Sequence, residues 1–238
     1  MTFLITATLI VFALNYPLDF NEPIYSIVNK IEKNYQPLSL SEIKQLEEKY
    51  GFNKNIPQQY KEQMLIALSH YPELVNTPIE VKTVQNSSYP LISIPQISSL
   101  LSPGEERKYL ILINENEKAF PDELLLKNIP YNAQVGILGH ELSHTLFYTQ
   151  KNIPELIAPG IMYLLGSFQE KFEKTADIRT IQHGLGWQLL DFSTFVRNRL
   201  SDSKYLSWIE KNYLSPDEIK QVMKGMKEYN LQNYGQNQ

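Results

Sequence analysis

The chain contains no cysteine among its 238 residues. Disulfide scaffolds, thiolate nucleophiles, iron–sulfur clusters and cysteine-rich zinc knuckles are therefore excluded, and any bound metal ion must be held by nitrogen and oxygen atoms. A chain of this length buries most of its apolar side chains in one core, and 42% of its residues are hydrophobic. We therefore expect one domain of ordinary size that needs neither a cross-link nor a metal ion to fold.

The charge balance argues against a nucleic-acid partner. The chain has 22 basic and 26 acidic residues, which gives a formal net charge of −4, and no basic cluster stands out. Binding to nucleic acid ordinarily requires a concentrated positive patch. The sequence therefore predicts no nucleic-acid partner, and it gives no indication of the oligomeric state.

Residues 3–14 form an uncharged apolar run of the length found in the hydrophobic region of a signal peptide. A bilayer-spanning helix needs about 20 such residues, so this run is too short to cross a membrane. The first basic side chain is Lys30, and the usual positive start of a signal peptide is reduced to the terminal amine. We assign residues 1–20 to a signal peptide or N-terminal apolar segment and residues 21–238 to a single domain. Export to the periplasm or medium is predicted. The alternative is a cytoplasmic protein in which the segment belongs to the fold, and membrane association is expected only if the segment is retained.

The periodicity of apolar residues changes twice along the chain. Helical spacing is followed by strand-like alternation and then by helical spacing again. Capping boxes mark two helix starts, one at Ser39 with Glu42 and one at Ser215 with Glu218. The expected helical regions are 23–34, 40–50, 57–68, 132–148, 161–183 and the C-terminal part; the expected strands are 78–84 and 107–113, with a loop or edge strand within 86–104. The sequence predicts an α+β fold that is dominated by helices, with a small mixed sheet before the helix at 132–148.

Two histidines lie four residues apart in the helical segment His140-Glu141-Leu142-Ser143-His144. Four residues make slightly more than one helical turn, so both imidazoles project from the same face and can reach one Zn²⁺ ion. Glu141, next to the first histidine, can act as a general base toward water. The alternative is a pair of histidines that merely caps or solvates a helix face.

A catalytic zinc site needs a third protein ligand. One family of zinc peptidases has a third histidine six residues after the second, but Gln150 stands there in this chain. Glu173 and Asp177 are better candidates because they share one face of a helix. Glu173 can complete the ligand set, and Asp177 can accept the free ring N–H of His140. The alternative is an ordinary solvated helix face that carries these acidic residues among lysines.

Together, residues 140–144 and 173–177 resemble the two signature helices of gluzincin zinc metallopeptidases. The resemblance covers residues 135–181, and residues 183–187 are similar to a stretch in small bacterial members. It implies a zincin-like domain in which a peptide lies along an edge strand, here residues 108–114. It also implies the roles of five residues: zinc ligands His140, His144 and Glu173, general base Glu141 and orienting carboxylate Asp177.

The large gluzincins stabilise the transition state with a Tyr or His from a long C-terminal domain, and we expect no such domain within these 238 residues. His183 is the candidate for that role, with Tyr148, Tyr163 and Arg179 as further possibilities close to the motifs. His70 is interpreted as a helix-end residue.

The sequence thus predicts a zinc-dependent peptidase that acts on peptide or protein substrates and in which Glu141 activates water. One alternative is a catalytically silent zinc-containing protein that uses the same groove to bind a partner. A second is a di-iron helical bundle. That architecture needs two Glu-x-x-His pairs, and the chain has one, Glu141 with His144.

Overall fold

A computed structural model of the chain describes residues 31–103, 106–152 and 166–229. The prediction for residues 1–20 lies outside these ranges, as does most of the helix expected at 23–34. Residues 31–39 are described and are not helical. Within the described ranges, no helix combines the length and the apolar character that a bilayer crossing requires.

Four strands form one mixed sheet in the first half of the described chain. They are β1 (Lys54–Asn55), β2 (Ile79–Val84), β3 (Leu91–Pro95) and β4 (Tyr109–Asn114). The spatial order is β1-β2-β4-β3, with β1, β2 and β4 parallel and β3 antiparallel to β4. The prediction that residues 108–114 form the edge strand is therefore wrong, because β4 is paired on both sides. The edge beside the metal-ligand motifs is β3, from the stretch expected to hold a loop or edge strand.

Seven α-helices are described. Both predicted capping boxes are present, because Ser39 and Ser215 each accept a hydrogen bond from the backbone of the glutamate three residues later. The α+β prediction is confirmed. The helices are α2 (Leu40–Tyr50), α3 (Lys61–Ser69), α4 (Tyr131–Thr149), α6 (Gly166–Thr180), α7 (Gly186–Arg199), α8 (Ser203–Asn212) and α9 (Pro216–Lys224).

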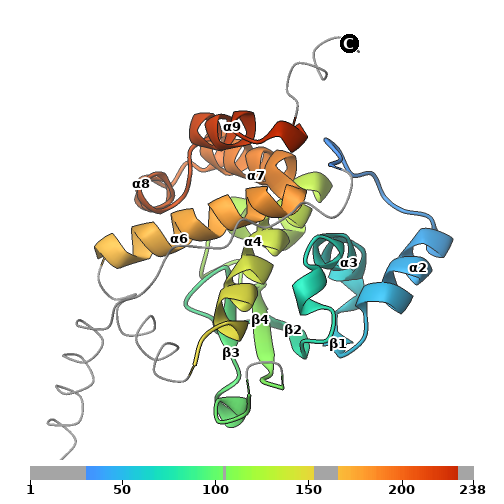
Figure 1. The fold of residues 1–238 in the computed structure, drawn as a ribbon. Helices are drawn as coiled ribbons and strands as arrows, with labels where there is room; N and C mark the ends of the chain where they lie inside the picture. Colours follow the sequence, from blue (N-terminus) through green and yellow to red (C-terminus); the bar gives the residue numbers. More distant parts are fainter. Residues whose placement is uncertain (1–30, 104–105, 153–165, 230–238) are drawn as a thin grey trace, which may run out of the picture.

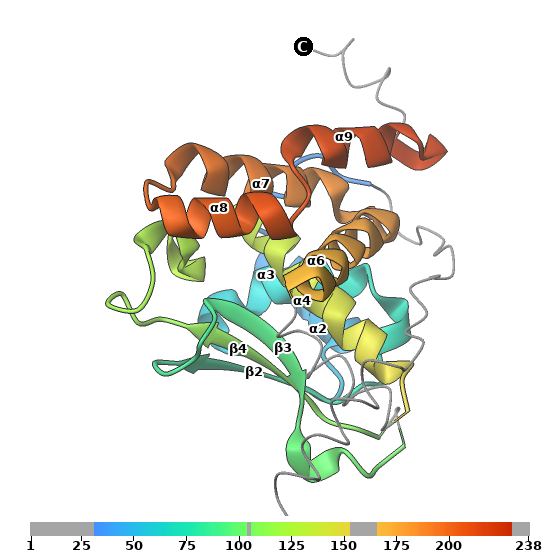
Figure 2. The same ribbon diagram turned by 90° about the vertical axis from the view of Figure 1, so that its left-hand side faces the viewer.

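Helix α4 lies at the centre of the molecule, with the sheet on one side and α7 to α9 on the other (Figures 1 and 2). It packs against α3, α6, α7 and β3. Gly136 permits the close crossing of α7, because a Cβ atom there would lie 2.4 Å from the backbone of Gln188. Between α6 and α7, Gly184 has a φ of 91°, a conformation that glycine adopts without strain. The chain thereby turns out of α6 and returns across α4.

Candidate metal centre

His140 and His144 face the same side of α4, and both are buried. Their Nε2 atoms lie 3.0 Å apart. An imidazole pair that only solvated a helix face would be exposed, so that alternative is wrong. The two nitrogens instead converge on a common point inside the protein.

Helix α6 is fixed to α4 by buried polar contacts at Ser143, within the first motif. The Ser143 hydroxyl donates to the carbonyl of Ala176 over 3.1 Å. The Arg179 guanidinium donates to the Ser143 carbonyl over 2.9 Å and to its hydroxyl over 3.0 Å. This docking turns Glu173 and Asp177 toward the histidines, and both carboxylates are buried. The interpretation of this face as solvated is therefore wrong, and Arg179 has a structural position in the helix pair.

The carboxylate of Glu173 completes a three-atom cluster with the two histidines. Its Oε2 atom lies 3.0 Å from Nε2 of His140 and 3.2 Å from Nε2 of His144. Tetrahedral zinc, with bonds of about 2.0–2.1 Å, holds its ligand atoms roughly 3.3 Å apart. The three separations are close to that value, so this buried group could hold a metal ion.

Asp177 lies behind the cluster and contacts two segments of the chain. Its Oδ1 atom accepts a hydrogen bond from Nδ1 of His140 over 2.8 Å, and its Oδ2 atom accepts one from the backbone N–H of Leu214 over 2.8 Å. A proton on Nδ1 leaves the lone pair of Nε2 directed into the cluster. Such a carboxylate orients a ligating imidazole and raises its basicity. The predicted partner of Asp177, His140, is thus the residue that it contacts.

Interactions within the cluster oppose the effect of burial on the pKa values of His140 and Glu173. Burial alone would lower the pKa of His140, but the hydrogen bonds to Asp177 and Glu173 outweigh it and raise that pKa. A metal ion held here would take the place of the proton on Nε2. Burial alone would raise the pKa of Glu173, but His144 and His140 hold it well below its ordinary value. Glu173 is therefore an anion at neutral pH, as a metal-ligating carboxylate must be.

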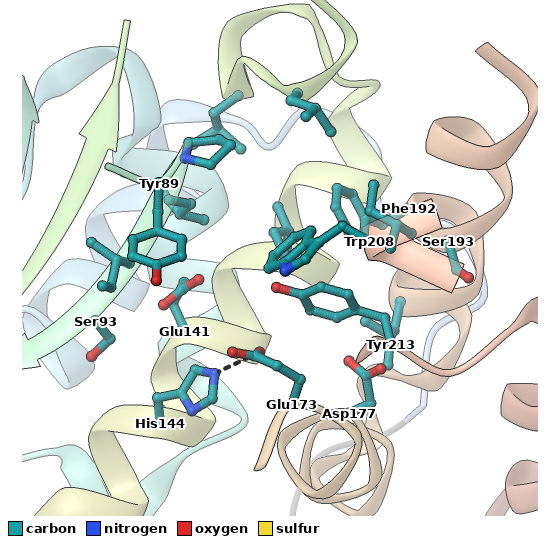
Figure 3. A pocket seen from close by; sticks show the side chains of 18 of the residues that line it. Tyr89, Ser93, Glu141, His144, Glu173, Asp177, Phe192, Ser193, Trp208 and Tyr213 are labelled. Atoms are coloured by element: carbon teal, nitrogen blue, oxygen red, sulfur yellow. Dashed lines mark hydrogen bonds and ion pairs between the residues drawn. The ribbon is translucent and has the colours of Figure 1, made fainter. Parts of the chain in front are cut away.

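Glu141 points from α4 into an adjacent cavity (Figure 3). Burial raises its pKa to about 7, with a further increase from Glu173, while His140 and a backbone hydrogen bond from Ser93 act in the opposite direction. Its Oε2 atom is buried and has no hydrogen-bond partner among the described residues. A carboxylate with a pKa near 7 and one free oxygen can accept a proton and release it again at neutral pH.

The cavity beside the cluster has a volume of about 590 Å³. Figure 3 shows Tyr89 and Ser93 on one side of it, Phe192, Trp208 and Tyr213 on the other, and His144 and Glu173 at its base. The side chains that flank the ligands therefore come from both the sheet edge and the C-terminal helices. Glu141, His144 and Glu173 all line the cavity, so a molecule inside it can reach the candidate metal position.

Sequence reasoning missed Tyr213. It follows α8, its ring centroid is 5.4 Å from that of His140, and its hydroxyl points into the cavity (Figure 3). Tyr89 points its hydroxyl toward Glu141 from the opposite wall. The chain has 15 tyrosines, and no local motif distinguishes these two, because only the tertiary fold brings them to the cluster.

The structure does not bring His183 to the cavity. Its ring stacks on Tyr71 with centroids 4.2 Å apart, and its Nδ1 atom donates to the carbonyl of Arg179 over 2.7 Å. His70 lies at the end of α3, as expected, and its Nδ1 atom donates to the carbonyl of His183 over 2.7 Å. Tyr148 does line the cavity, whereas Tyr163 lies outside the described residues.

Comparison with known proteins adds no evidence about this site. No protein-family model matches the chain, and no curated protein and no solved structure matches it. What the cluster could bind is therefore argued from its own geometry and donor chemistry. Two imidazole nitrogens and one carboxylate oxygen suit a divalent transition-metal ion.

Proposed function

We propose that this chain is a zinc-dependent peptidase whose general base is Glu141. One observation carries the proposal: three buried ligand atoms converge beside a carboxylate that has a free oxygen, at the base of a cavity. A purely structural metal site has no need of such a carboxylate. Its presence favours hydrolysis over the alternative of a silent binding protein.

Zinc is the metal that we propose for His140, His144 and Glu173. Catalytic zinc sites have three protein ligands and leave one position for water or substrate. Non-haem iron also uses two histidines and one carboxylate, so metal analysis of the purified protein decides between the two ions. A bound zinc ion would supply Lewis-acid activation of water and of a carbonyl group.

Two side chains would handle protons and charge during hydrolysis. Glu141 would take a proton from the attacking water and deliver it to the leaving amine, because its carboxylate lines the cavity beside the ligand atoms and keeps one oxygen free. Tyr213, with its hydroxyl directed into the cavity, would donate a hydrogen bond to the oxygen that develops negative charge. We assign to Tyr213 the role for which the sequence pointed to His183.

The outer edge of β3, beside which no further strand is described, provides a place for a peptide backbone, with the N–H of Ser93 already bonded to Glu141. The run of residues from Ser88 to Ile94 lines the cavity, and β3 is the last strand of the sheet on this side. An extended peptide can add to such an edge through main-chain hydrogen bonds. The scissile bond of a peptide bound there would pass above Glu141.

The test compares the full-length protein with its Glu141→Gln variant. We expect about one equivalent of zinc in both, hydrolysis of peptides by the wild type, and a loss of roughly 10²–10⁴-fold in kcat in the variant, since a positioned general base contributes about that much. Glu170→Gln is the matched control, because Glu170 lies on α6 and pairs with Lys174. Full activity of Glu141→Gln would remove Glu141 as the base.

A further inference from the structure

The cavity wall opposite β3 is built from apolar and aromatic side chains. Phe120 and Leu124 come from the segment before α4, Phe192 comes from α7, and Trp208 and Ile209 come from α8. Trp208 packs edge-on against Tyr213, with ring centroids 5.3 Å apart. A wall of this composition receives apolar surface and gains free energy as water leaves.

Two basic side chains line this side of the cavity, and one of them is held by the backbone. Apart from the carboxylates at the metal centre, the charged side chains among the described lining residues are Arg197 and Lys204. Arg197 donates to the carbonyl of Ser193 over 3.3 Å and to that of Tyr213 over 3.2 Å. The ammonium group of Lys204 lies 5.8 Å from the centroid of the Tyr205 ring. This wall thus offers no carboxylate to a basic side chain, and its arginine is committed to the backbone.

The wall is held in shape by polar contacts at two consecutive residues. Arg197 binds the carbonyl of Tyr213, Asp177 binds the N–H of Leu214, and the hydroxyl of Ser193 donates to the carbonyl of Leu214 over 3.0 Å. Both backbone groups of Leu214 are therefore fixed by buried side chains. A preformed wall loses little conformational entropy when it is filled, and it discriminates by shape.

We infer that the cavity selects substrates with a large apolar side chain, aromatic or long aliphatic, next to the scissile bond. An extended peptide along β3 would direct alternate side chains away from the sheet edge, and the wall of Phe192 and Trp208 lies across the cavity from Tyr89 and Ser93 (Figure 3). The inference rests on the proposed peptidase function for its substrate class, and it names Phe192 and Trp208 as specificity-determining residues.

The first test uses fluorogenic peptides that are identical except at one residue beside the cleaved bond. With Phe or Leu there, kcat/KM should exceed the value for Ala by about 10-fold or more, and peptides with Asp or Lys should be cleaved least. Cleavage of all five peptides at similar rates would overturn the inference and leave the peptidase function intact.

Variants at the two tryptophans of the chain provide matched controls. Trp208→Glu places a carboxylate in the wall and should shift the preference toward Lys; Trp208→Gln, which adds no charge, should only weaken the preference for Phe. Trp187 does not line the cavity, so Trp187→Phe should leave the preference unchanged. A cooperative thermal unfolding transition is the check that each variant is folded. An unchanged preference in folded Trp208→Glu contradicts the assignment.

A binding experiment separates failure of the inference from failure of the proposed function. In zinc-loaded Glu141→Gln/Trp187→Phe, Trp208 is the remaining tryptophan, and its fluorescence reports occupancy of the cavity. The Phe peptide should bind at concentrations about 10-fold lower than the Asp or Lys peptide. If this difference in binding is found but the wild type hydrolyses none of the peptides, the apolar binding site is supported and the peptidase function is rejected. Equal binding of all three peptides would reject the apolar site.

Discussion

Tyr213 is held in position by contacts with neighbouring side chains, because it lies outside the helices. It follows the last residue of α8, and its backbone is held by Arg197 while its ring packs near His140. A hydroxyl fixed before the reaction needs no reorganisation when charge develops on the substrate.

For Tyr213→Phe we expect kcat to fall by roughly 10²-fold, since the loss of one donor to an oxyanion has about this effect. KM and the zinc content should change little, because the ring and its packing remain. Steady-state kinetics measures kcat and KM, and metal analysis measures the zinc content. Tyr60→Phe, which removes a hydroxyl bonded to Glu115 instead, should retain wild-type kcat. Equal rates for Tyr213→Phe and wild type would show that another group stabilises the transition state.

The grouping of the candidate ligand residues was predictable in part from sequence, because helical spacing fixes the relative direction of their side chains. His140 and His144 must share a face of α4 wherever that helix lies, and the same holds for Glu173 and Asp177 on α6. What the sequence left open was whether the two faces meet. The answer depends on the packing of α6 against α4 around Ser143, which no periodicity encodes.

The order of strands was the least predictable feature at the scale of elements. Residues 109–113 form a continuous apolar run, which is typical of a strand covered on both faces and paired on both sides. Proline and serine around β3 suit a sheet edge, where a missing N–H is tolerated. Local composition thus favoured β3 as the edge, whereas the family resemblance pointed to residues 108–114.

The crossing of α4 and α7 at Gly136 gives a prediction on stability. In Gly136→Ala the new Cβ atom would lie 2.4 Å from the backbone of Gln188, so the helices must separate. Overpacking of this kind lowers the free energy of unfolding by about 1–3 kcal/mol. Urea unfolding measures the loss. In the control Gly225→Ala, at the end of α9, the nearest atom would be 3.3 Å away, and its stability should stay close to that of the wild type.

Stability of the whole molecule should depend on pH through His70. Burial lowers the pKa of His70 to about 4, compared with about 6.5 in an unfolded chain. Its Nδ1 proton goes to the carbonyl of His183, so Nε2 accepts the hydroxyl proton of Tyr35 over 2.7 Å. The folded state thus requires the neutral ring.

Between pH 6.5 and 4 the unfolded chain binds a proton at this position that the folded chain does not. The contribution of His70 to the free energy of unfolding is therefore fully present above about pH 6.5. About 3 kcal/mol of that free energy is lost as the pH falls to 4. Urea unfolding across this range should give a flatter pH dependence for His70→Gln, which keeps an amide donor and acceptor. Parallel curves for the two proteins would exclude His70 as the titrating group.

The two carboxylate oxygens of Asp177 accept hydrogen bonds from different parts of the protein, one from the imidazole of the candidate ligand His140 and one from the segment that lines the cavity. If the proposed ion and peptide both bind, their effects on each other are reciprocal: the factor by which the ion raises the affinity for peptide equals the factor by which the peptide raises the affinity for the ion. With a peptide bound, the protein should therefore retain the ion at a higher free concentration of chelator than the protein without peptide.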